Sequence, residues 1–128
     1  MRRFITPLLC FMLACASPLA PDANGQWGST QADLVLTRGG GRLTLQCGSG
    51  TIDSTWQLSD AGDFTASGMT YSGGGPDPIG GRPPHPSLFT GHISGSTFTL
   101  SIVVIQSNAT LGPYRMRRGG PAVGLVCL

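Results

Sequence analysis

The 128-residue sequence predicts an all-β protein, and three observations lead to this fold class. From about residue 27 onward, apolar and polar residues alternate in the way that is typical of half-buried strands. Glycine-rich turns interrupt the alternation about every eight to twelve residues. No segment combines a helical spacing of apolar residues with capping residues. We therefore expect a small eight-stranded antiparallel meander barrel with one disulfide, and a β-sandwich is the alternative.

The residues before this domain are expected to form an export signal. Two arginines precede an apolar stretch over residues 4–14, and small residues follow it. The stretch is too short to cross a bilayer core of about 30 Å as a helix. We predict a signal peptide of residues 1–14, or of residues 1–16 if the cut follows Ala16.

The end of this leader, Met12-Leu13-Ala14-Cys15, resembles the lipobox of bacterial lipoproteins, in which cleavage precedes a cysteine whose sulfur carries diacylglycerol. The resemblance implies that Cys15 anchors the mature protein in the membrane of the cell envelope. Residues 15–26 would then tether the β-domain, residues 27–128, to that membrane. Cleavage after Ala16 would instead discard Cys15 and release a soluble periplasmic or secreted protein.

The first four predicted strands are expected because apolar residues recur at every second position between turn signals. These strands occupy residues 32–37, 43–47, 52–58 and 64–71. The turns between them are expected at Gly39-Gly40-Gly41, at Gly48-Ser49-Gly50 and at Asp60-Ala61-Gly62. The irregular segment 72–86 follows, and its prolines lack the N–H donor that a sheet requires.

Four further strands are expected after this loop, at residues 89–93, 98–104, 111–117 and 121–127. Closing the eight strands into a barrel would remove the edges that so apolar a flat sheet would expose. The alternation assigns mostly bulky apolar residues to the inner face, enough to fill a short barrel. This inner set is Leu34, Leu36, Leu43, Leu45, Ile52, Trp56, Leu58, Phe64, Phe89, Ile93, Phe98, Leu100, Ile102, Val104, Tyr114, Met116, Val123 and Leu125.

Only two cysteines remain available for a disulfide in the mature chain. Cys10 leaves with the leader, and Cys15 is either lipidated or removed. In an exported protein the remaining pair, Cys47 and Cys127, most simply forms one disulfide. Closing so long a loop would stabilise the fold by about 4 to 5 kcal/mol on the loop-entropy estimate.

The segment Gly25-Gln26-Trp27 resembles the Gly-x-Trp entry of lipocalins and avidins. That resemblance implies a tryptophan packed across one end of an eight-stranded barrel. The wider layout is similar to uncharacterised small exported bacterial β proteins. It is carried by Trp27-Gly28, by C-G-x-G-x-I from Cys47, by F-x-x-x-G from Phe64, by F-x-G-x-I-x-G from Phe89 and by a closing cysteine. This similarity implies no particular chemistry.

Charge and composition argue against several classes of function. The formal net charge of +2 comes from the two arginines of the leader, and the mature chain has six Arg, six Asp, no Lys and no Glu. The basic surface of a nucleic-acid binder is therefore missing. His85 and His92 are the only histidines, and no residues have the spacing of a catalytic triad or a metal site. We expect no enzyme activity, no metal and no cofactor.

Two groups of residues are candidates for contact with a partner. Tyr71, Arg82 and His85 lie in or beside the long loop, and long loops of compact domains often carry function. Arg115 and Arg117, together with Arg118, could anchor a phosphate or a carboxylate. The sequence therefore predicts a lipid-anchored binding or structural module of the cell envelope, whose partner is an unknown protein or small molecule. The alternative is a small barrel that carries a hydrophobic ligand.

Overall fold

A computed structural model describes residues 21–73 and 79–122, and these residues form β-strands without any helix. The strands are β1 (Gly25–Gly28), β2 (Ala32–Thr37), β3 (Gly40–Leu45), β4 (Gly48–Ile52), β5 (Gln57–Leu58), β6 (Asp63–Ser72), β7 (His85–Ser94), β8 (Thr97–Val104) and β9 (Ala109–Arg118). Because the described ranges contain no helix, none of their segments could cross a membrane as one.

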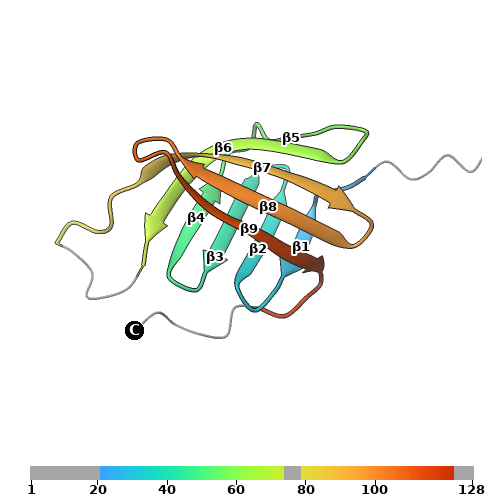
Figure 1. Cartoon of the computed structure of the whole chain (residues 1–128), viewed down its shortest axis with the longest axis horizontal. Helices are drawn as coiled ribbons and strands as arrows, with labels where there is room; N and C mark the ends of the chain where they lie inside the picture. Colours follow the sequence, from blue (N-terminus) through green and yellow to red (C-terminus); the bar gives the residue numbers. More distant parts are fainter. Residues whose placement is uncertain (1–20, 74–78, 123–128) are drawn as a thin grey trace, which may run out of the picture.

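The strands form a closed antiparallel barrel of eight strands, with β5 as an additional strand. Each strand pairs with its neighbours in sequence, except that β4 pairs directly with β6 and β1 pairs with β9. Figure 1 shows β1–β4 side by side, with β7–β9 crossing them at a steep angle. β6 bends, so that its end runs beside β4. The predicted barrel is confirmed, and the sandwich alternative is not what forms.

The third predicted strand, residues 52–58, is wrong in its boundaries. The expected turn Gly48-Ser49-Gly50 is the first part of β4, which ends at Ile52. The chain then leaves the barrel wall, and the two-residue β5 pairs only with β6. Glycine has no side chain with which to show an alternation, so the sequence pattern could not distinguish a glycine-rich strand from a turn.

The irregular loop is shorter than the predicted segment 72–86, because β7 begins at His85 and includes Pro86. Pro86 lies opposite Met69 of β6, and its carbonyl accepts a hydrogen bond of 3.0 Å from the amide of Ile105. Proline is tolerated near the start of a strand, where the missing N–H breaks little of the ladder.

The strand that closes the barrel is β1 and not the predicted last strand, residues 121–127. Pro121 and Ala122 are described and lie outside any strand, and the other residues of that prediction lie outside the described ranges. Cys47 lies in the turn between β3 and β4. Its predicted partner Cys127 lies outside the described residues, as does Cys15, so the disulfide and the lipid anchor stay predictions.

The inner face of the barrel is the one that the alternation predicts. Of the expected inner set, eleven side chains are buried, and Leu45, Trp56, Leu58 and Tyr114 are partly buried against them. Val104 is half-buried, and Val123 and Leu125 lie outside the described residues. The buried members are Leu34, Leu36, Leu43, Ile52, Phe64, Phe89, Ile93, Phe98, Leu100, Ile102 and Met116.

Aromatic rings fill one end of the barrel, which we call the closed end. It is the end with the turns β2–β3 and β7–β8 and the connections around β5. The centroids of Trp27 and Phe98 are 5.3 Å apart, those of Phe98 and Phe64 are 5.2 Å apart, and those of Phe64 and Trp56 are 5.8 Å apart. Edge-to-face pairs of this kind stabilise a core beyond the area that they bury.

Arg118 joins the N-terminal residues to this aromatic cluster. Its guanidinium carbon lies 4.2 Å from the centroid of Trp27, which is fully buried. The same guanidinium donates to the carbonyl of Asn24 at 2.7 Å and to the carbonyl of Asp22. The Trp27 indole N–H donates to the carbonyl of Ala23 at 2.9 Å. Residues 22–24, which we call the N-terminal arm, are therefore held across the closed end.

Replacing Arg118 with methionine is expected to lower the free energy of unfolding by about 2 kcal/mol. The variant loses a cation–π contact and two hydrogen bonds to carbonyls. At this exposed side chain each of the three contributes on the order of 0.5 to 1 kcal/mol, which together give about 2 kcal/mol. Urea denaturation followed by circular dichroism measures the change. Arg117→Met is the matched control, because Arg117 is exposed on the outer face, and it should change stability by less than about 0.5 kcal/mol. Equal losses in the two variants would contradict this role of Arg118.

Candidate binding site at the barrel mouth

A pocket of about 560 Å³ occupies the end of the barrel opposite the aromatic cluster, which we call the mouth. This end contains the turns β3–β4 and β8–β9 and the loop between β6 and β7. The pocket is lined by Leu45, Cys47, Gly48, Ser49, Thr70, Tyr71, Ser72, His85, Val104, Gln106, Ser107, Ala109 and Leu111. Large aromatic side chains fill the closed end, whereas the inward side chains near the mouth are smaller or polar.

One wall of the pocket is apolar. Leu45 ends β3, Val104 ends β8, and Ala109 and Leu111 begin β9. The alternation of each strand turns these side chains toward the barrel axis. Leu45 and Leu111 also pack against the buried core, so this wall continues the core surface up to the mouth.

The opposite wall is polar and comes from β4, β6 and β7. Its most buried residue is Thr70, whose hydroxyl contacts that of Ser87, a residue that lies outside the lining. Thr70 and Ser87 are 5% and 1% exposed. The two hydroxyl oxygens lie 2.9 Å apart, and the Ser87 hydroxyl donates to the carbonyl of His85 at 2.9 Å. Burying hydroxyls in this way costs little because both are hydrogen-bonded. Nearer to solvent the same wall carries Tyr71 and the half-buried imidazole of His85.

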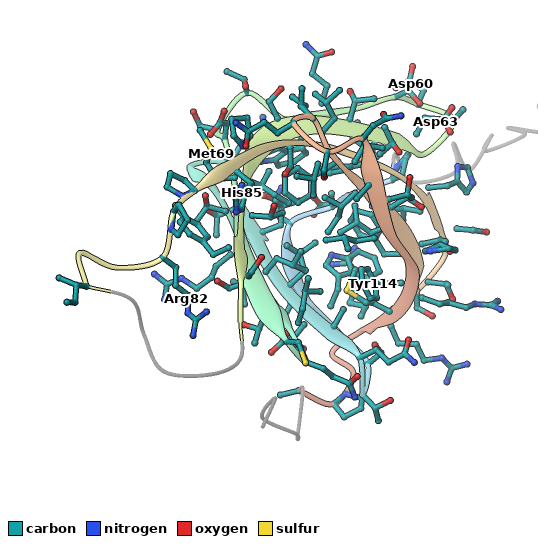
Figure 2. All side chains as sticks on the ribbon, turned by 60° about the vertical axis from the view of Figure 1, so that its left-hand side comes forward. Asp60, Asp63, Met69, Arg82, His85 and Tyr114 are labelled. Atoms are coloured by element: carbon teal, nitrogen blue, oxygen red, sulfur yellow. The ribbon has the colours of Figure 1, made fainter. Side chains whose placement is uncertain are left out.

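The structure brings together the three predicted partner-binding residues around the long loop. Tyr71 and His85 line the pocket. The guanidinium of Arg82 donates to the carbonyl of Ser72, a lining residue, at 2.7 Å. In Figure 2, Arg82 and His85 lie on the loop side of the barrel and Tyr114 lies across from them. The sequence predicted Leu45 and Val104 on the inner face, but it did not identify Thr70, Ala109 and Leu111 of the lining or Ser87 beside Thr70.

The three clustered arginines do not act as one group. Arg115 and Arg117 extend from the outer face of β9 and line a separate surface hollow of about 330 Å³, together with Thr30 and Thr97. Arg118 is turned toward the closed end and is engaged by the N-terminal arm. The expected anion-binding cluster is therefore reduced to Arg115 and Arg117, which lie away from the mouth pocket.

The remaining titratable groups of the described residues lie outside the lining of the mouth pocket. His92 is exposed, and its Nδ1 lies 3.1 Å from a carboxylate oxygen of Asp63 on the surface. Within the described parts of the chain, no three or more His, Cys, Asp or Glu side chains are gathered in a possible metal site. At the closed end, hydrogen bonds from the backbone and side-chain N–H groups of Asn24 lower the pKa of Asp22.

Comparisons with models of protein families, with curated proteins and with solved structures returned no match. The function must therefore be argued from the geometry of the chain itself.

Tyr114, on the inner face of β9, is expected to ionise above the ordinary tyrosine value of 10.0. Burial raises the pKa of its phenol, because the interior disfavours the phenolate. The unfolded chain then releases this proton at a lower pH than the folded chain. The contribution of Tyr114 to stability is thus fully present below pH 10 and is lost as the pH rises through the folded pKa.

Ultraviolet absorbance of the phenolate measures this shift. Tyr71 and Tyr114 are the only tyrosines in the chain, so Tyr114→Phe should leave a titration from Tyr71 alone. The component that disappears should be one that titrates above pH 10. Loss of a component at or below pH 10 would contradict the burial of Tyr114.

Proposed function

We propose that this protein is an exported, lipid-anchored domain of the cell envelope that binds a small amphipathic ligand and has no enzymatic activity. The observation that supports binding is the mouth pocket, whose apolar wall faces a wall of hydroxyl groups. A small-molecule site commonly has this composition, with apolar surface for affinity and a few polar groups for orientation. The hydrophobic-ligand alternative is less well supported, because aromatic side chains already fill the interior below the mouth.

The position of the N-terminal arm supports an anchor that leaves the mouth accessible. The N-terminal arm lies at the closed end, opposite the pocket. A lipid on Cys15 would attach a few residues before this arm. The membrane would then lie nearer to the closed end than to the mouth, and a ligand could still enter.

Intact-mass measurement of the mature protein tests the anchor. We expect a chain that begins at Cys15 and carries an added diacylglycerol, as the lipobox resemblance implies. Cys15→Ala should abolish the added mass and release the protein from the membrane fraction. An unmodified chain that begins at Ser17 would contradict the anchored reading and leave a soluble exported protein.

Titration with N-phenyl-1-naphthylamine, an uncharged fluorophore, tests the pocket. We expect fluorescence to rise on binding, and Leu111→Asp should weaken binding by at least about tenfold, because it places a charge in the apolar wall. Leu88→Asp is the matched control. Leu88 is 46% exposed on the outer face of β7 and lies outside the pocket lining, so binding should be unchanged. Equal effects of the two substitutions would contradict binding at the mouth.

A further inference from the structure

The hydrogens of the two buried hydroxyls on the polar wall can be assigned from the geometry. Thr70 and Ser87 each have one hydroxyl hydrogen to donate and lone pairs that can accept. The acceptors within reach are the carbonyl of His85 and the oxygen of the other hydroxyl. In one arrangement Thr70 donates to Ser87, and Ser87 donates to His85 over 2.9 Å. In the other, Ser87 donates to Thr70, and Thr70 donates to His85 over 3.4 Å.

Both arrangements use both hydrogens within the protein. The first has the shorter bonds and leaves the lone pairs of Thr70 without a donor from these partners. Thr70 is the most buried polar residue of the pocket lining, so a head group that reaches the deep part of the pocket would meet its hydroxyl oxygen. This oxygen can accept a hydrogen bond but has no hydrogen left to donate.

The pocket lining also contains no charged carboxylate or guanidinium among the described residues; His85 is its one basic side chain. An anionic head group would therefore meet lone pairs at depth and would find no fixed positive charge there. A neutral head group with an O–H or N–H would satisfy Thr70, while its apolar part packs on Leu45, Val104 and Leu111.

We propose that the mouth pocket selects neutral amphiphiles whose head group donates a hydrogen bond, such as an alcohol or an amide, and discriminates against carboxylates and against ethers. This inference rests on the proposed binding function and names the class of ligand. The discrimination arises at Thr70, and Ser87 is the positioning residue that keeps the Thr70 hydrogen engaged.

Three probes of one chain length isolate the head group. They are 1-octanol, which donates and accepts, 1-methoxyoctane, which only accepts, and octanoate at pH 8, which is an anion without a donor. Binding to the purified mature protein is measured by displacement of N-phenyl-1-naphthylamine. We expect 1-octanol to bind about five to ten times more tightly than 1-methoxyoctane, the range that one net hydrogen bond gives, and octanoate to bind more weakly than 1-octanol.

Substitutions at the two hydroxyls test where this preference arises. Thr70→Val keeps the shape of the side chain and removes the acceptor. The variant should therefore bind 1-octanol and 1-methoxyoctane about equally well. Thr70→Ser keeps the hydroxyl and should keep the preference. Ser87→Ala removes the nearer acceptor and leaves the Thr70 hydrogen only the 3.4 Å contact with the His85 carbonyl. The hydrogen is then easier to redirect to a ligand, so binding of 1-methoxyoctane should improve relative to wild type, an effect that loss of structure alone would not produce.

The possible results separate the inference from the proposed function. Equal binding of the three probes, or a preference that survives Thr70→Val, would overturn the ligand class while leaving the pocket as a binding site. Tighter binding of octanoate than of 1-octanol would also overturn it. If neither the fluorophore nor any probe binds, the proposed binding function fails, and the ligand class fails with it.

Discussion

The barrel closes through one short seam between β1 and β9, and the enclosed core depends on it. These strands pair only at Trp27 with Arg118 and at Gly28 with Arg117, whereas β6 and β7 pair over the whole of β6 up to Thr70. So short a ladder would be a weak closure by its backbone hydrogen bonds alone. It is strengthened because Trp27 and Arg118, which are opposite each other in the ladder, also stack as side chains. Without this seam, both strands would expose an open edge and the apolar interior beside it.

The fold class and the inner face could be predicted because burying one face of a strand requires alternation. Phe89 and Phe98 lie inside, as the pattern indicates. The closing strand could not be predicted in this way, because Gly25–Gly28 has a single large apolar residue and no alternation to detect. Its role in closing the barrel depends on pairing with β9, which lies about ninety residues later in the chain. The beginning of β4 was missed for a related reason, since Gly48 and Gly50 have the composition of a turn.

The candidate site was predictable where it borders the long loop and where Leu45 and Val104 continue the inner face of their strands. Tyr71 and His85 were identified because they flank an unusually long irregular segment. Thr70 and Ser87 were not identified, because a hydroxyl residue in a strand can equally well face solvent. They lie inside because each is an even number of residues from an inward neighbour on its own strand, as Ser87 is from Phe89. The alternation along β9 also distinguishes Arg118 from Arg115 and Arg117. Met116 points inward, and Arg118, two residues later on the same face, turns toward the closed end.

The hydrogen bonds from Arg118 to the N-terminal arm determine how a pulling force would reach the barrel. If the chain is pulled from its N-terminus, as a membrane anchor would pull it, the load first reaches residues 22–24. Because these residues are bound to the end of β9 as well as being continuous with β1, the tension is shared between the first and last strands of the barrel. The force then acts along both sides of the seam together and does not peel β1 away from β2. The weakest ladder of the barrel thus carries little of the load, because a force that reaches both of its strands together does not pull one strand past the other.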